Sequence, residues 1–335
     1  MYWYAYDVMK EALPDMGKTL IRLIAVALLL TLLAFLAPSA TPLAIGEEAM
    51  PVYTPVVLEM QDAEPIDYLE RTPYEPAKEN YLPDKGGYVD PSISVRVETM
   101  RAYDTTIQLT WVQIAHASQL RAELCKPYPS KAVARADTLA KRVDAILAIN
   151  DDWFMHRKEG FIVRNGKELR ANYSELYDCL IIDDKGDMHI IPQPTEEKIS
   201  AFEGNIIHAL AFGPGLVVDG ELRSDFTAEG PGILKECTPH KETQRIALCQ
   251  MDSLSYLIVA TEGPENKGST GLTMTEFAQL CYDLGARQAF NLDGGSSSSV
   301  ILNNKKINSL STGKIRSIGG ILYFVTAVPG EGSEK

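Results

Sequence analysis

The chain has 335 residues and a formal net charge of −13, from 45 acidic and 32 basic residues. Its length suffices for one large domain with additional segments, and its composition excludes collagen-like, coiled-coil and wholly disordered proteins. So acidic a balance argues against nucleic-acid partners, because non-specific binding of nucleic acid needs cationic groups that neutralise phosphates.

The N-terminal residues 1–46 are typical of an export segment. Lys10, Lys18 and Arg22 precede an uncharged run over residues 23–46, so we expect the basic flank to stay inside and the remainder to be exported. The strongly apolar part has about 14–18 residues, between a signal-peptide core and a full membrane span. Cleavage after Ala40 and permanent anchoring both stay open. We favour the anchor, which predicts a single-pass cell-membrane protein with an extracellular domain, secreted if the segment is cleaved.

Seven prolines and many acidic residues lie between residues 47 and 91. Proline fixes φ and removes a donor, and like charges repel one another. We therefore expect residues 47–85 to form an extended stalk that holds the folded part away from the membrane.

Residues 86–328 carry the patterns of a compact catalytic domain, before a disordered tail at 329–335. Alternation or continuous apolar runs predict strands, and turn residues separate several of them. The clearest predicted strands are 92–97, 106–114, 143–149, 245–251, 256–260 and 288–292, with hairpin turns at 184–187 and 219–220. Strands outnumber helices and follow one another without intervening helices. We therefore predict an α+β fold, a single domain with a mixed, mostly antiparallel sheet and a few packed helices.

Two segments have clear helical signals. Ser130 is a candidate cap for a helix that ends near Arg142. Thr273 and Glu276 form a capping box for a second helix, which Gly285 ends.

A polar loop follows the buried strand after each helix. Asn150 and Asp152 come after the first of these strands, and Asn291 and Asp293 come at the end of the second. Ligands gather at the carboxyl ends of strands, where loops present side chains above a rigid floor. If the two strands are neighbours, these four side chains converge on one cleft.

The sharpest motif is the Asp293-Gly294-Gly295 turn with its serine run. Glycines allow close approach of the backbone, and successive N–H groups in such a turn form an anion-binding nest. Asp293 supplies a carboxylate that can act as base or nucleophile. A tight turn with solvated serines explains the same pattern equally well.

Residues 271–297 resemble the phosphodiester glycosidase family, whose hallmark is an NLDGGGS run after a GLTL-x-E-like helix. Other segments resemble the family's motifs in the same order. They are 149–154 (N-G-G-[FY]-F), 212–220 (F-G-P-x-L-V-x-D-G), 244–247 (R-T-A-I-G), 261–263 (D-G-[RQ]) and 316–323 (the closing strand). The likeness covers roughly residues 86–328, and several ordered motifs are more specific than one.

The resemblance implies that the substrate is a sugar-1-phosphodiester, for example in an exopolysaccharide or another cell-surface glycopolymer, and that water releases the sugar. A phosphodiester leaves readily as an anion, so its departure needs charge stabilisation, which Arg245 can provide. Asp293 and Glu262 are the predicted carboxylate pair. The predicted substrate-binding residues are Asn150, Asp152, His208, Asn291, Gly294, Gly295, Ser297 and Arg316. For His208 a structural role, and for Arg316 a surface ion pair, are the competing interpretations.

Several positions depart from the family's motifs. Asp151 and Asp152 replace paired glycines, Ser296 replaces the third glycine of the hallmark, and Glu262 and Pro264 replace the family's Asp and Arg or Gln. The departures at Asp151, Asp152, Glu262 and Pro264 keep open an alternative, a non-catalytic glycan-binding or envelope-assembly protein with the same fold. An ordinary glycosidase that needs no phosphate is disfavoured by the arginine and glycine motifs.

The acidic residues also raise the question of a metal. Calcium prefers carboxylate and carbonyl oxygens, but the spacing of Asp151, Asp152 and Asp293 is not that of an EF-hand loop. We expect that no cofactor is required and leave a bound divalent cation such as calcium open.

Overall fold

The computed structural model describes residues 50–59, 63–71, 74–226, 237–309 and 313–329. It divides the chain into two compact units, Met1–Glu47 and Glu48–Lys335. The first unit, with the predicted membrane segment, lies outside the described residues, as do residues 330–335 of the predicted tail. Among the residues that are described, no helix is long and apolar enough to cross a membrane.

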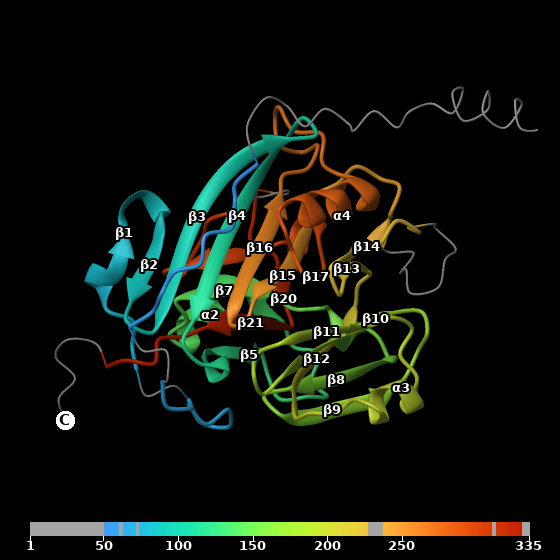
Figure 1. The fold of residues 1–335 in the computed structure, drawn as a ribbon, viewed down its shortest axis with the longest axis horizontal. Helices are drawn as coiled ribbons and strands as arrows, with labels where there is room; N and C mark the ends of the chain where they lie inside the picture. The colour runs from blue at the N-terminus through green and yellow to red at the C-terminus, as the bar shows by residue number, and fades with distance from the viewer. Residues whose placement is uncertain (1–49, 60–62, 72–73, 227–236, 310–312, 330–335) are drawn as a thin grey trace, which may run out of the picture. The chain divides into compact units, whose positions relative to one another are not determined.

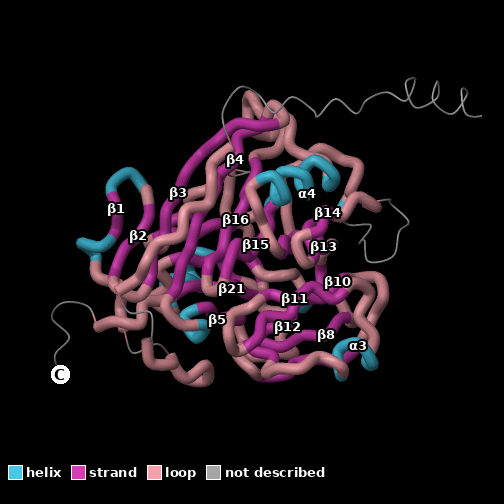
Figure 2. Tube along the Cα trace, in the orientation of Figure 1, coloured by secondary structure: helices cyan, strands magenta, loops and turns pink. Residues whose placement is uncertain are grey.

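Strands dominate the second unit (Figure 2). The largest sheet has nine strands in the order β1-β2-β3-β4-β16-β15-β17-β13-β14 (Figure 1). Their bounds are β1 Tyr81–Leu82, β2 Gly87–Asp90, β3 Ile93–Ala102, β4 Thr105–Ile114, β16 Ser255–Thr261, β15 Ile246–Asp252, β17 Gln288–Asn291, β13 Gly215–Val218 and β14 Glu221–Leu222.

Two five-stranded sheets and one two-stranded sheet complete the described strands. The first five-stranded sheet has the order β11 (Met188–Ile191), β10 (Asp178–Asp183), β12 (Ile206–Phe212), β8 (Gly160–Arg164) and β9 (Lys167–Asn172). The second has the order β19 (Lys305–Lys306), β18 (Val300–Leu302), β7 (Leu147–Asn150), β21 (Gly320–Phe324) and β5 (Leu120–Leu124). The two-stranded sheet pairs β20 (Ser317–Ile318) with β6 (Ala134–Arg135).

Every pairing between these described strands is antiparallel. Short hairpins explain much of this: Tyr103 and Asp104 join β3 to β4 with φ values of 52° and 50°, the left-handed conformation of a two-residue hairpin turn. The predicted α+β class, a single domain rich in antiparallel strands, is confirmed. The expectation of a mixed sheet is wrong for the strands described.

Three α-helices lie within the described residues: α2 (Ala136–Arg142), α3 (Glu196–Ser200) and α4 (Met274–Asp283). The predicted capping box of α4 is present, since the Thr273 hydroxyl accepts from the Glu276 N–H and the Glu276 carboxylate accepts from the Thr273 N–H. The helix α2 begins later than predicted from Ser130. The residues just before it form β6 and pair with β20, so they are extended.

Part of the predicted stalk packs on the domain. Leu58, Ala63 and Ile66 are buried in a hydrophobic cluster that also contains side chains of α2 and β21. The buried Arg121 donates hydrogen bonds to the carbonyls of Asp67 and Glu70. The described residues of this segment belong to the compact unit Glu48–Lys335, together with the residues from 86 onward.

Candidate active site

A cavity of about 230 Å³ lies where β15 begins and β17 ends. The two strands are paired here, with Ala247 opposite Asn291. The lining residues are Phe212, Cys237, Thr238, Thr243, Gln244, Arg245, Asn291, Leu292, Asp293, Gly294, Gly295, Ser296 and Arg316. Six of the predicted site residues therefore line one cavity: Arg245, Asn291, Asp293, Gly294, Gly295 and Arg316.

The glycines give the turn after β17 its path. Gly295 has a φ of +54° and donates its N–H to the Gln244 carbonyl over 2.9 Å. A Cβ at Gly294 would lie 2.7 Å from that same carbonyl oxygen, a distance that no side chain tolerates without movement of the backbone. The two glycines hold the turn tightly against the chain before β15. Because the Gly295 N–H is already used, it is not a donor for an anion.

Asp293 is connected to a cation through a serine. Arg316 is exposed and donates to the hydroxyl of the buried Ser297 over 2.8 Å. Ser297 is hydrogen-bonded to the Asp293 carboxyl, and this bond lowers the pKa of Asp293, as do the charges of Arg316 and Arg157. Burial acts in the opposite direction and has the larger effect, so the pKa of Asp293 is raised above its ordinary value. The cavity thus contains a carboxyl that takes up a proton readily, beside a guanidinium that can bind an anion.

Arg245 lines the cavity, but its guanidinium forms hydrogen bonds to backbone carbonyls of the protein. It donates to the carbonyls of Leu272, Cys237, Thr238 and Lys241 over 2.7–3.0 Å. Burial lowers its pKa to about 10. The prediction that Arg245 binds phosphate does not fit this placement, because nearly all of its N–H groups are engaged; it fixes the loop at the cavity wall.

The residues that follow β7 are built into the protein interior. The buried Asn150 donates from Nδ2 to the Asp293 carbonyl over 2.8 Å and accepts at Oδ1 from the Ser299 N–H over 2.9 Å. Asp152 pairs with Arg164 at 2.5 Å and accepts from the Ala211 N–H at 2.7 Å. The two predicted loops therefore meet, although β7 and β17 lie in different sheets. Asn150 and Asp152 hold structure and do not line the cavity, which corrects their assignment as substrate ligands.

Asp151 is a buried acid that lacks full hydrogen bonding. Its Oδ1 accepts from the Trp153 N–H over 3.1 Å, while its Oδ2 has no hydrogen-bond partner among the described residues. A Cβ at Gly320 would lie 2.6 Å from that Oδ2, so the carboxyl occupies the space above this glycine. Burial, with the neighbouring charge of Asp152, raises the pKa of Asp151 to about 7.

Glu262 and His208 lie outside the cavity lining. The Glu262 carboxylate accepts from the hydroxyls of Ser269 and Ser309. Burial raises its pKa, but hydrogen bonds from Ser269, Ser309 and Thr106 and the charge of Arg101 together have the larger effect, so the pKa is lowered. His208 is completely buried, its Nε2 bonds the Leu120 carbonyl over 3.1 Å, and burial lowers its pKa to about 3, so the ring is neutral. The structural interpretation of His208 agrees with this placement. Glu262, the predicted partner of Asp293 in catalysis, does not line the cavity.

Comparisons with known proteins identify the family. The sequence model of the family described as phosphodiester glycosidase matches residues 144–325, more than half of the chain. The chain belongs to this family.

The chain is also similar to one curated protein and to one solved structure. The SPbeta prophage-derived uncharacterized protein YomE of Bacillus subtilis (strain 168) is 27% identical over 187 residues, which cover 54% of this chain and 28% of YomE. The chain thus spans little more than a quarter of that relative. The catalytic domain of zebrafish N-acetylglucosamine-1-phosphodiester alpha-N-acetylglucosaminidase, auto-inhibited by its pro-peptide, superposes with a TM-score of 0.57 at 14% identity. That match covers 75% of this chain and 86% of the zebrafish domain and shows a shared fold.

Arg157, whose charge acts on Asp293, was not predicted from the sequence as a site residue. The Arg157 guanidinium lies over the rings of Tyr177 and Phe212, at 4.5 and 5.1 Å from their centroids. It donates to the carbonyls of Asp152 and Ala211, while its Nε and Nη1 are buried without a hydrogen-bond partner among the described residues. No sequence motif includes Arg157, because its contact with Phe212, at the end of β12, joins residues that are far apart in the chain.

The described residues contain no group of three or more His, Cys, Asp or Glu side chains that could hold a metal ion. Asp152, one of the three acidic residues considered for calcium, is paired with Arg164 at 2.5 Å. All five cysteines are described and none forms a disulfide; the Cys237 thiol donates to the Gly213 carbonyl.

Proposed function

We propose that the chain is an exported hydrolase, anchored by its N-terminal segment, that cleaves the glycosyl–phosphodiester bond of a sugar-1-phosphodiester in a cell-surface glycopolymer. The observation that carries the proposal is the connection of Arg316 through Ser297 to Asp293 at one cavity. Membership of the phosphodiester glycosidase family supports the reaction class.

The two charged groups suit the two halves of the reaction. Arg316 is exposed at the cavity, and its planar fork can bind the phosphodiester and stabilise the charge that develops as the phosphate departs. Asp293, when ionised, removes a proton from water as the water attacks the anomeric carbon. The C1–O bond breaks, the oxygen leaves with the phosphate as a phosphomonoester, and the sugar gains a hydroxyl. No metal is part of this proposal.

The test is incubation of the full-length chain with α-N-acetylglucosamine-1-phosphodiesters, with and without chelator, and mass detection of the products. We expect free sugar, and a loss of rate of about 10²–10⁴-fold in Asp293→Asn. Asp283→Asn is the matched control, because Asp283 is exposed on α4. Sugar phosphate as the product would mean that the P–O bond breaks and would contradict the mechanism.

A non-catalytic glycan-binding protein is the second candidate. Among the described residues that line the cavity, Asp293 is the only carboxylate, whereas many glycosidases use two. Binding of glycosyl phosphodiesters without any turnover, lost in Arg316→Ala, would favour this alternative.

A further inference from the structure

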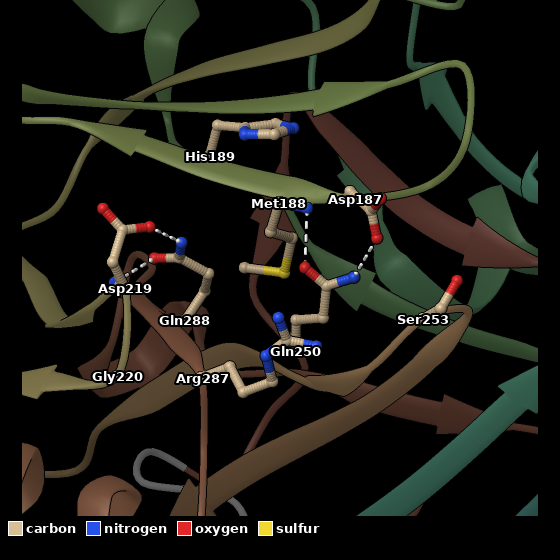
Figure 3. Close-up of a pocket in the computed structure, with 9 residues that line it drawn as sticks. All are labelled: Asp187, Met188, His189, Asp219, Gly220, Gln250, Ser253, Arg287 and Gln288. Atoms are coloured by element: carbon tan, nitrogen blue, oxygen red, sulfur yellow. Dashed lines mark hydrogen bonds between the residues drawn. The ribbon is translucent and has the colours of Figure 1, made fainter.

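A second cavity, of about 390 Å³, lies away from the candidate active site (Figure 3). It shares no lining residue with the first cavity. Its walls come from both the nine-stranded sheet and the β11 edge of a five-stranded sheet. Gln288 lies in this cavity at the start of β17, and Asn291 lies in the candidate active site at the end of that strand. The two cavities are therefore at opposite ends of β17.

Two glutamines form one side of the cavity. Gln250 on β15 and Gln288 on β17 are direct partners in the sheet, so their side chains leave the same face. They are only 6% and 7% exposed, and buried amides of this kind require partners. Figure 3 shows the two side chains diverging, with Met188 between them.

Each amide is held by an aspartate. Gln250 donates to the Asp187 carboxylate over 2.8 Å and accepts from the Met188 N–H over 2.7 Å. Gln288 donates to the Asp219 carboxylate over 2.6 Å and accepts from the N–H of the same residue over 3.2 Å. Both amides are therefore fixed in orientation before any ligand arrives, which reduces the entropy that a ligand would lose in ordering them.

Each pair keeps one donor and one acceptor for a ligand. An amide nitrogen has two N–H groups and a carboxylate has two oxygens, and in each pair one of each is used inside the pair. A hydroxyl group matches what remains, because it donates to the carboxylate and accepts from the amide. Two such pairs at one cavity match a ligand with several hydroxyls.

The charges around the cavity disfavour other ligands. Asp187 and Asp219 would repel a phosphate, and Arg287, at the rim, is itself paired with Asp252 at 3.3 Å. His189 is bonded to Asp183 at 3.0 Å. No metal-binding group of three His, Cys, Asp or Glu occurs in the part of the chain that is described.

We propose that this second cavity is a binding site for a neutral pyranose, held by the Asp187–Gln250 and Asp219–Gln288 pairs. The volume lies within the usual range for small-molecule sites, about 300–1,000 Å³. The proposal is independent of hydrolysis at Asp293. Combined with it, the cavity holds a sugar of the glycopolymer away from the bond that is cleaved.

Saturation-transfer NMR of the full-length chain with neutral methyl pyranosides (gluco, galacto, manno and N-acetylglucosamine) tests the proposal. We expect at least one glycoside to bind, and Asp187→Asn and Asp219→Asn each to weaken it by about tenfold or more. Both substitutions preserve shape and the oxygen that accepts from the glutamine, and replace the other acceptor by a donor. Asp283→Asn, exposed on α4, should bind as the unaltered chain does.

Three results would overturn the proposal. They are the absence of binding by every glycoside, binding that Asp293→Asn abolishes while both cavity variants retain it, and displacement of the glycoside by millimolar methylammonium, which would identify a cation site. Thermal melting verifies that each variant is folded. If one cavity variant does not fold, the other decides the result, because the two aspartates belong to different hairpins.

Discussion

Asp293 lies among groups that have opposing effects on its carboxyl. Burial raises its pKa, while Ser297, Arg316 and Arg157 lower it. The net result is a carboxyl that ionises at a higher pH than a free aspartate. If it acts as the base, activity must rise with pH as the carboxyl loses its proton, and each neighbouring cation determines where that rise occurs.

Removal of one cation should move this rise. In Arg316→Ala we expect the pKa of Asp293 to increase, because a nearby positive charge favours the ionised form. The acidic limb of the pH–rate profile then shifts to higher pH, and KM for a phosphodiester increases. Arg316→Lys retains the charge and should shift the limb less. An identical limb in all three proteins would contradict the proposed coupling of Arg316 to Asp293.

Asp151 should affect stability in a defined pH window. Its folded-state pKa of about 7 lies above the unfolded value of about 3.9, so the folded state binds more protons between these values. Stability therefore falls as pH rises from about 4 to 7. We expect Asp151→Asn to remove this loss and to be more stable than the unaltered chain at pH 8, by more than about 1 kcal/mol, with little difference at pH 4.

Urea unfolding across pH 4–8 measures the Asp151 effect, with Asp283→Asn as the exposed control. Equal pH dependence in Asp151→Asn and the unaltered chain would show that the Asp151 carboxyl is ionised in the folded state at ordinary pH.

At the scale of elements, Arg245 connects β15 to the chain segments around it. Its guanidinium bonds carbonyls at 237, 238, 241 and 272, so one side chain fixes the loop before β15 and the approach to α4. Such an arrangement depends on the planar fork of arginine, because a lysine ammonium has three donors from a single atom.

We therefore expect Arg245→Lys to retain the fold but to lose about 1–3 kcal/mol of unfolding free energy, as buried carbonyls lose their donors. Urea unfolding checks this value. Arg101→Lys is the control, since Arg101 is exposed and bonds the Gly268 carbonyl at the surface. If both variants lose the same small amount, the guanidinium is not a structural clamp.

Local signals predicted some elements well. The capping box at Thr273 fixed the start of α4, because both partners lie within one turn of chain. The strands β3, β4, β15 and β16 were also predicted correctly, because the apolar pattern of each strand lies within its own short segment. Ser130 failed as a helix start because the chain that follows pairs with β20, nearly two hundred residues away in sequence, a contact that no local pattern contains.

The candidate site was predictable in part. The Asp293 turn follows from its glycines, whose roles are local. Asp152 pairs with Arg164, twelve residues away, and His208 bonds the Leu120 carbonyl, 88 residues away. Arg245 bonds carbonyls in the irregular loop just before it and at Leu272. No sequence pattern distinguishes these structural roles from ligand binding. Arg157 and the second cavity depend on packing between sheets and had no sequence signal.

At the scale of the whole molecule, the N-terminal part of the folded unit matters for stability. Leu58 is 6% exposed within a core cluster and Leu69 is 79% exposed, although both belong to the segment predicted as a stalk. In a stalk that made no contact with the domain, both leucine side chains would be exposed to solvent.

We expect Leu58→Ala to destabilise the protein by about 2–4 kcal/mol, through lost burial and the cavity it leaves, and Leu69→Ala to have almost no effect. Thermal and urea unfolding of the two variants measure the difference. Equal stabilities would mean that the segment does not contribute to the core in solution.

The two bonds of Asn150 have a consequence for how the site opens. This side chain, at the end of β7, holds the Asp293 carbonyl on one side of the turn and the Ser299 N–H on the other. Local unfolding in proteins proceeds in cooperative units. Loss of β7 would release both ends of the turn at once. The amides of β7 and of residues 297–299 should therefore exchange with deuterium as one unit. The Asp293 turn, which follows β17 of the nine-stranded sheet, then opens at the rate at which β7 of the five-stranded sheet opens.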